Sequence, residues 1–227
     1  MVEYYKENCN DNIEKNTQQL VHFYFYHVCQ YYVYLQEMDG IKEQIELEDI
    51  SSWNVSNVTN MSAMFRGATS FNGNLSGWDV FNVTYMTSMF LNSSSFNGDL
   101  SSWDVSNVTA MNRMFSGASN FNQDISSWDV FNVTDMSHMF NGAQAFNSDL
   151  SSWDVSNVTS MDNMFNNTLA LSDENKCAIH TSWSLNDNWP YQEWSEICSA
   201  LSSVTFTENI ISTNANGASS VFAMDLD

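Results

Sequence analysis

The sequence predicts an α/β repeat solenoid of about five strand–helix coils, with a cap at each end. Tryptophan recurs every 25 residues from Trp53 to Trp153, and a fixed period of this size is the signature of stacked repeats. Two different apolar spacings within each repeat indicate one strand and one helix. A single such unit cannot bury its apolar face, so the repeats are expected to stack.

The strand is predicted at the I/L-S-x-W-D-V part of each repeat. Leu75, Trp78 and Val80 stand at L-x-x-L-x-L spacing, and Trp78-Asp79-Val80 alternates between inward and outward positions as a short strand does. The aspartate therefore points outward in each coil. The resulting outward column comprises Asp79, Asp104, Asp129 and Asp154, and begins with Asn54.

The helix is predicted at S-N-V-T-x-M-x-x-M-F. Val58, Met61, Met64 and Phe65 occupy positions that line one face of a helix. Two residues after each such Phe comes Gly or Asn, which most readily adopt the left-handed conformation that closes a helix. These residues are Gly67, Asn92, Gly117, Gly142 and Asn167. The methionines are interpreted as core residues that fill gaps between imperfectly identical coils.

A second period of 50 residues lies inside the first, because the residue before the Asn of N-V-T alternates between Ser and Phe. Phe81 and Phe131 therefore lie on every second coil, about 10 Å apart at the spacing of adjacent strands. Their burial decides whether they belong to the core or to a binding stripe. The core is the favoured interpretation.

Three polar columns have competing explanations. The Asp79 to Asp154 column is either solvated and screened by salt, or bridged by calcium or a basic partner. The column of Asp49, Asn74, Asp99, Asp124 and Asp149 is interpreted as structural, with its side chains bonding backbone amides. The asparagines of N-V-T are glycosylation sequons, but they are more simply an internal ladder that satisfies backbone groups.

Composition excludes several functions. With 27 acidic and 6 basic side chains the formal charge is -21, so nucleic acid and anionic membranes would be repelled. No apolar run approaches the roughly 20 residues that span a bilayer, and the N-terminus lacks a secretory signal. The histidines are scattered and no nucleophile or phosphate-binding motif is present, so no enzyme is predicted.

The repeated residues F-N-x-D-L/I-S-S-W-D-V-S-N-V-T-x-M-x-x-M-F-x-G-A resemble the BspA-like leucine-rich-repeat surface proteins, over about residues 49–171. The resemblance implies an extracellular or cell-surface adhesion and interaction protein, with a protein or glycan as partner. The segment over residues 172–200 also resembles the closing segment of such arrays and is expected to form a C-terminal cap. At the other end, residues 1–48 are expected to form a tail and an aromatic-rich cap, because a solenoid must cover the apolar end of its first coil.

Two further expectations concern the C-terminal part. Cys177 and Cys198 bracket a tryptophan-rich segment, and a disulfide is expected between them if the protein is secreted, worth roughly 3 kcal/mol by loop closure. Residues 201–227 resemble the truncated start of an FG-GAP (VCBS-type) repeat. In that family Asp225 and Asp227 would be the first calcium ligands; two carboxylates make no cage, so no metal site is predicted.

The first functional hypothesis is a non-enzymatic interaction module that presents an acidic face with Asp79, Asp104, Asp129 and Asp154, flanked by Phe81 and Phe131. The alternative is a repeat protein that binds calcium on its Asp column and is stabilised by it. No cofactor other than calcium is suggested by either hypothesis.

Overall fold

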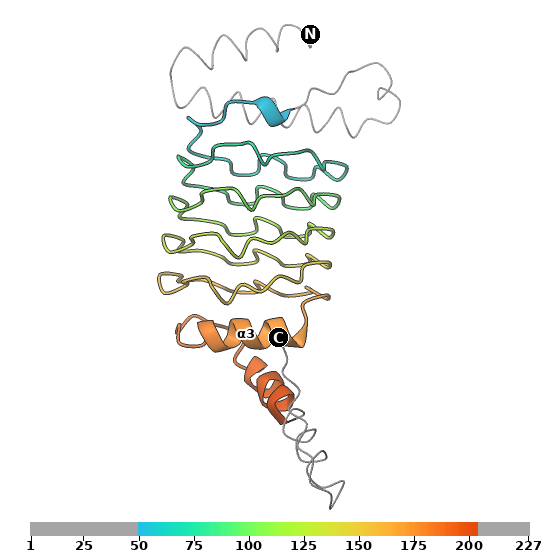
Figure 1. Cartoon of the computed structure of the whole chain (residues 1–227), viewed down its shortest axis with the longest axis vertical. Coiled ribbons are helices and arrows are strands. Elements are labelled where there is room, and N and C mark those ends of the chain that lie inside the picture. Colours follow the sequence, from blue (N-terminus) through green and yellow to red (C-terminus); the bar gives the residue numbers. More distant parts are fainter. Residues whose placement is uncertain (1–49, 204–227) are drawn as a thin grey trace, which may run out of the picture.

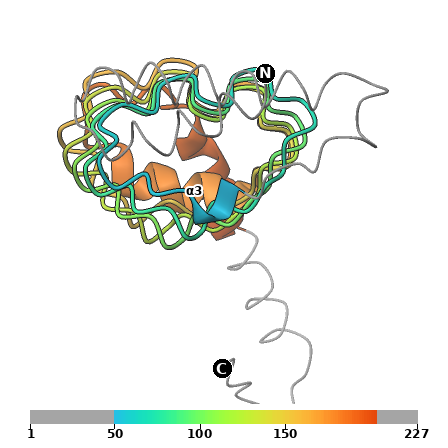
Figure 2. The ribbon, with the colours of Figure 1, turned by 90° about the horizontal axis from the view of Figure 1, so that it is seen from above.

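The structure is a computed structural model that describes residues 50–203. Its helical elements are η1 (Ile50–Ser52), α3 (Asp173–Trp183) and a helix over residues 194–203. Between η1 and α3 the chain forms coils of turns and bends that lie above one another (Figure 1). Viewed from above, the coils share one outline (Figure 2).

The predicted α/β solenoid is wrong. Within the coils, residues 50–171, there is no strand and no α-helix. Neighbouring coils instead meet at isolated parallel bridges that keep the 25-residue register. These bridges are Asn60–Tyr85, Tyr85–Ala110, Ala110–Asp135 and Asp135–Ser160.

The predicted helix fails because two residues of each repeat have a left-handed backbone. The first coil has φ of 57° at Ala63 and 74° at Gly67, and a left-handed residue interrupts a right-handed helix. Met64 N donates to Met61 O at 3.3 Å within its own turn, whereas Phe65 N donates to Met89 O of the next coil at 2.9 Å. Backbone amides in this segment thus alternate between bonds within their own turn and bonds to the next coil. The left-handed prediction is confirmed at Gly67, Asn92, Gly117, Gly142 and Asn167, but these residues belong to turns rather than to helix ends.

The predicted strand fails because side chains take up the backbone amides on both sides of Trp78. Asn74 Oδ1 accepts from Ser76 N at 3.0 Å, and Asp79 Oδ1 accepts from Phe81 N at 3.2 Å. Such local bonds compete with sheet formation and bend the chain. Only a short segment around Trp78 lies between the two turns, and it is too short to form the backbone hydrogen bonds of a β-sheet with the next coil.

Side chains supply many of the bonds between coils. Trp78 Nε1 donates to Ile50 O at 2.9 Å, and Thr84 donates to Thr59 O through both its amide (2.8 Å) and its hydroxyl (3.0 Å). The same pattern continues through the stack at Trp103, Trp128, Trp153, Thr109, Thr134 and Thr159.

The core consists of identical residues stacked in columns. The rings of Phe65 and Phe90 lie 5.4 Å apart between centroids, and those of Phe90 and Phe96 within one coil lie 3.9 Å apart. The two methionine columns are buried throughout, which confirms their assignment to the core. Burial of this kind is the main source of stability in a stack of repeats.

Helix α3 and the segment after it cover the last coil. Trp183 stacks on Trp153 at 6.1 Å, and the Tyr191 hydroxyl accepts from Phe165 N at 2.8 Å. Burial raises the pKa of Tyr191 to about 12, with Glu193 and Asp162 adding to the rise.

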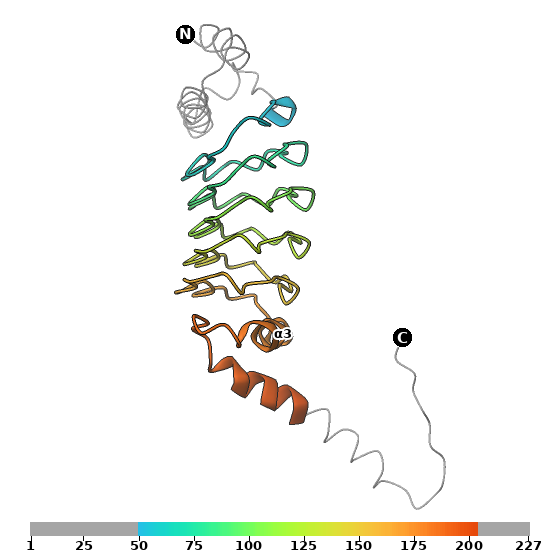
Figure 3. The ribbon, with the colours of Figure 1, turned by 90° about the vertical axis from the view of Figure 1, so that its left-hand side faces the viewer.

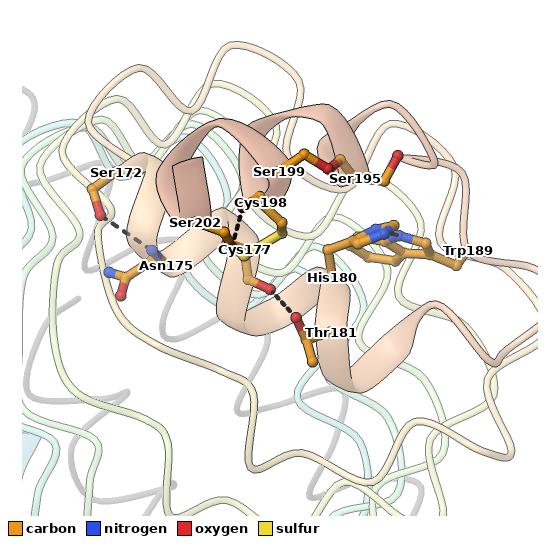
Figure 4. The surroundings of a disulfide bond; sticks show 10 residues. All are labelled: Ser172, Asn175, Cys177, His180, Thr181, Trp189, Ser195, Cys198, Ser199 and Ser202. Atoms are coloured by element: carbon orange, nitrogen blue, oxygen red, sulfur yellow. Dashed lines mark hydrogen bonds between the residues drawn. A yellow bond between two sulfur atoms is a disulfide. The ribbon is translucent and has the colours of Figure 1, made fainter. Parts of the chain in front are cut away.

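Figure 3 shows α3 beneath the stack and the 194–203 helix extending beyond it. A disulfide joins Cys177 of α3 to Cys198 of that helix, with Cα atoms 5.1 Å apart (Figure 4). These are the two cysteines expected to pair. The expected N-terminal cap over residues 1–48 and most of residues 201–227 lie outside the described residues.

The middle Trp column gives a first prediction. Trp103 is 4% exposed and donates to Leu75 O at 3.0 Å, so Trp103→Ala should leave a cavity and remove one of the two hydrogen bonds that this carbonyl accepts. We expect a loss of roughly 3–5 kcal/mol in the free energy of unfolding, measured by urea denaturation. Phe81→Ala on the surface is the control, and a loss below about 1 kcal/mol for Trp103→Ala would contradict the assignment.

A second prediction separates turns from a helix. Ala63 has φ of 57°, whereas Ala110 has no positive φ. Glycine adopts the left-handed region without steric cost, so Ala63→Gly should leave stability unchanged or raise it. Ala110→Gly should lower it by about 0.5–1 kcal/mol through chain entropy. Equal losses for both variants, measured by urea denaturation, would rule out the left-handed turn.

Candidate functional site

The candidate site is the surface formed by the outward Asp column and the residues two positions after it. We call it the Asp–Phe face; it comprises Asp79, Phe81, Asp104, Ser106, Asp129, Phe131, Asp154 and Ser156. All four aspartates are exposed, as predicted for an outward column. Phe81 and Phe131 are 49% and 47% exposed, so the interpretation of these two side chains as core is wrong.

The exposure of Phe81 has a local cause. Asp79 Oδ1 accepts from Phe81 N at 3.2 Å, and this turn directs the chain outward after the buried Val80. Val83, which is also buried, provides the next inward side chain. Position 81 therefore lies at the outside of a bend; Phe131 at the equivalent position is also exposed, and Ser106 is partly exposed.

The aspartates of the face are held differently in alternate coils. Asp104 Oδ1 accepts from both the amide (3.1 Å) and the hydroxyl (2.6 Å) of Ser106. Asp129 Oδ1 accepts from the amide of Phe131 at 3.1 Å, and phenylalanine has no hydroxyl to add. The coils with Phe thus give up one local hydrogen bond to the carboxylate.

Hydrogen bonds also lower the pKa of particular carboxyls. The hydroxyl and amide of Ser156 lower the pKa of Asp154, and the amide and hydroxyl of Ser101 lower the pKa of Asp99. Ser126 lowers the pKa of Asp124 in the same way, its amide contributing most. Donors that favour the ionised form act in this direction.

The second polar column bonds backbone amides, as predicted. Its side-chain oxygens accept from amides two residues later at 2.8–3.0 Å; these residues are Asn74, Asp99, Asp124 and Asp149. Asp49 lies outside the described residues.

The N-V-T asparagines bond backbone carbonyls of the preceding coil, as predicted, but the ladder is exposed at the edge of the Asp–Phe face and not internal. Asn107 Nδ2 donates to Phe81 O and Asn157 Nδ2 donates to Phe131 O, both at 2.8 Å. Asn82 and Asn132 make the equivalent bonds. The backbone that carries each exposed Phe is therefore fixed by the next coil.

The carboxylates of this face are exposed acceptors that repeat every 25 residues, and each is held by a donor of its own turn, as Asp104 is by Ser106 and Asp129 is by Phe131. The described part of the chain contains no group of three or more His, Cys, Asp or Glu side chains placed to hold a metal. Asp225 and Asp227 lie outside that part.

Sequence reasoning missed one exposed aromatic residue, Tyr85, which is 49% exposed. The corresponding positions in the other coils hold Asn60, Ala110, Asp135 and Ser160. This position varies from coil to coil, and variation at one position of a regular repeat is the sequence feature that indicates an exposed side chain there. Within residues 50–203 no helix is both long and apolar enough to span a membrane.

Fold and site together define a non-globular repeat protein, built of stacked 25-residue coils with one exposed acidic and aromatic face. The family described as a Mycoplasma protein of unknown function, DUF285, matches residues 33–131 and 100–188. Since these matches cover most of the chain, the protein belongs to that family. No curated protein and no solved structure matches the chain.

The lowered pKa values predict how stability depends on pH. Asp99 and Asp124 have folded-state pKa values below 3.8, so their hydrogen bonds stabilise the fold above that pH. This contribution is lost as the pH falls through the folded-state values. Between about pH 5 and pH 2 the Tm of the wild type should fall more steeply than that of Asp99→Asn/Asp124→Asn, which cannot titrate there.

The control for this experiment removes the same number of charges elsewhere. Glu193→Gln/Glu196→Gln changes two exposed carboxylates on the C-terminal segment. Thermal melts followed by circular dichroism give the Tm at each pH. If the control variant reduces the dependence of Tm on pH as much as Asp99→Asn/Asp124→Asn does, the effect comes from net charge and not from these hydrogen bonds.

Proposed function

We propose that this protein is a non-enzymatic, BspA-like interaction module of a cell-surface or secreted protein, and that its Asp–Phe face binds a protein partner with a basic surface. The observation that supports this most directly is the exposure of Phe81 and Phe131. The other repeated aromatic columns, those of Phe65, Phe71 and Trp78, are buried.

Each component of the face has a role in binding. Exposed aromatic side chains supply large contact area at low entropic cost and dominate the energy of many interfaces. A row of carboxylates steers a basic partner and fixes its register. The backbone beneath Phe81 and Phe131 is held by Asn107 and Asn157, so the face is organised before binding, which lowers the entropic cost of association.

Two observations support a location outside the cell. The chain belongs to the DUF285 family, whose model matches residues 33–131 and 100–188. The repeats also resemble BspA-like proteins, and this resemblance implies a location at the cell surface. The Cys177–Cys198 disulfide is of a kind that persists in oxidising compartments.

The test uses the natural alternation of the repeat. Phe81→Ser/Phe131→Ser gives both coils the residue that Ser106 and Ser156 already provide, so the free energy of unfolding should change by no more than about 0.5 kcal/mol. Loss of two aromatic anchors should weaken partner binding about 10-fold or more. The measurement is quantitative mass spectrometry of proteins retained from an extracellular extract by the immobilised chain.

The control is Leu169→Ser, which removes a different exposed apolar side chain, 75% exposed. Retention of the same proteins by wild type and the double Phe variant would contradict the proposal. Retention of glycans rather than basic proteins, lost in the Phe variant, would change the partner class. Asp104→Asn/Asp129→Asn should reduce both binding and its dependence on salt.

The calcium alternative is tested by melting the protein with calcium and with chelator. Magnesium at equal ionic strength is the control for screening. We expect no calcium-specific change in Tm, because each aspartate already accepts from its own turn, as Asp104 does from Ser106. A calcium-specific rise in Tm that is lost in Asp104→Asn/Asp129→Asn would support the alternative.

A further inference from the structure

Trp189 lies at the centre of the C-terminal cap, residues 172–200, which covers the last coil. Its side chain is 2% exposed, and its ring lies 5.4 Å from that of Trp183 and 5.5 Å from that of Trp194, between centroids. It also reaches the last coil directly, since its ring lies 6.4 Å from that of Phe165. A change in the position of Trp189 would therefore alter how the cap packs on the stack.

The polar atom of the Trp189 side chain bonds to a nitrogen that can take up a proton. Trp189 Nε1 donates to Nδ1 of His180 at 3.1 Å, and Figure 4 shows the two rings side by side. The indole nitrogen of tryptophan can only donate, so His180 Nδ1 must offer a lone pair in this contact. The hydrogen bond therefore exists only while His180 is neutral and carries its proton on Nε2.

The repeated tryptophans have no such dependence on pH. They donate Nε1 to backbone carbonyls at 2.9–3.1 Å; these residues are Trp78, Trp103, Trp128 and Trp153. A carbonyl oxygen accepts in the same way whether the solution is neutral or mildly acidic. Among these five tryptophans, only that of the cap has an acceptor that titrates.

The charged groups around His180 leave its ring without an ionic partner. The ion pair that the described residues contain joins Lys176 to Asp173, at 2.9 Å, so no carboxylate among these residues pairs with His180. The other carboxylates on the surrounding elements are Glu174 of α3, Asp187, Glu193 and Glu196 of the segment after it, and Asp154 and Asp162 of the last coil. His180 lies in the last turn of α3, where the partial negative charge of the helix end stabilises a cation. Its ring is partly exposed, so a proton from solvent can reach it.

We propose that the hydrogen bond between Trp189 and His180 is a pH-sensitive latch that holds the C-terminal cap on the last coil. When His180 takes up a proton on Nδ1, as imidazoles do between about pH 8 and pH 5, the lone pair is lost and two donors face each other. A buried donor without an acceptor is costly, so the protonated form favours a state in which Trp189 moves away from Phe165.

The direction of the pH dependence follows from the form of His180 that the closed cap requires. The closed cap binds neutral His180, so the latch stabilises the cap at the upper end of this pH range and the stabilisation is lost as the pH falls. The Cys177–Cys198 disulfide joins α3 to the 194–203 helix on the far side of Trp189. The opened segment therefore stays tethered, and the cap can close again when the pH rises.

The first test follows both side chains by NMR in the full chain. The ¹H–¹³C resonance of His180 Cε1–H, assigned with His180→Gln, reports its protonation. The ¹H–¹⁵N resonance of Trp189 Nε1–H, assigned with Trp189→Phe, reports the hydrogen bond. We expect both resonances to shift with the same midpoint between about pH 8 and pH 5. A Trp189 resonance that stays constant while His180 titrates would overturn the proposal.

The second test measures opening of the cap by amide hydrogen exchange. In the closed cap Trp189 N donates to Asn186 O at 3.0 Å and Trp194 N donates to Tyr191 O at 3.1 Å. The protection factors of these two amides, which correct for the intrinsic effect of pH on exchange, should fall about 5-fold or more from pH 8 to pH 5. The amide of Trp103 in the middle of the stack is the internal control and should keep its protection.

His180→Gln and His138→Gln form a matched pair of variants. Glutamine keeps an oxygen that can accept from Trp189 and does not titrate, so His180→Gln should remove the pH dependence of protection in the cap. His138 lies in the coils, next to Asn141, so His138→Gln should leave this dependence unchanged. Equal loss of the dependence in both variants would overturn the proposal.

Trp189→Phe keeps the test decisive if His180→Gln does not fold. Phenylalanine retains an aromatic ring in the cap but has no donor, so protection of the Trp194 amide should no longer depend on pH between about pH 8 and pH 5. A dependence retained in Trp189→Phe would overturn the latch. These measurements involve no binding partner, so their outcome is independent of the proposed function.

Discussion

The hydrogen bonds between successive coils are the constraint on which the rest of the structure depends. Their 25-residue register places each residue on its own counterpart, as Thr84 lies on Thr59. Side chains that both donate and accept can bond to identical coils above and below, and aromatic rings can stack on their counterparts. Threonine and asparagine meet the first condition, and Phe65 on Phe90 illustrates the second. The repetition of the sequence follows from this constraint.

The sequence therefore predicts which residues stack in columns more accurately than it predicts the secondary structure of each coil. The spacing of Val58, Met61, Met64 and Phe65 buries all four residues, but consecutive turns bury such a set as a helix does. The difference lies in φ at Ala63 and its counterparts Ser88, Arg113, His138 and Asn163, all of which are left-handed without being glycine. Asn163 is the only member of that column whose type adopts this conformation readily. Ala63, Ser88 and Arg113 are not of such a type, and their amides donate to carbonyls of the next coil.

For the candidate site, too, the position of a column could be predicted from the sequence, whereas the local backbone conformation could not. The outward Asp column follows from alternation around Trp78, and the structure agrees. The exposure of Phe81 depends on a bond between Asp79 Oδ1 and its amide, which composition alone does not specify. The contacts of Asn186 with the last coil could not be predicted from the repeat, because the loop after α3 has no counterpart in the coils.

The alternation of Ser and Phe on the face argues for selection by a partner rather than by folding. In the Ser coils the hydroxyl of Ser106 donates to Asp104 at 2.6 Å, whereas Phe131 can make no such bond. The Phe coils also leave about half of an aromatic side chain in water. A residue that forgoes a local hydrogen bond and gains little burial has no explanation within the stack. Contact with the basic partner proposed above, in which the ring would become buried, would supply that explanation.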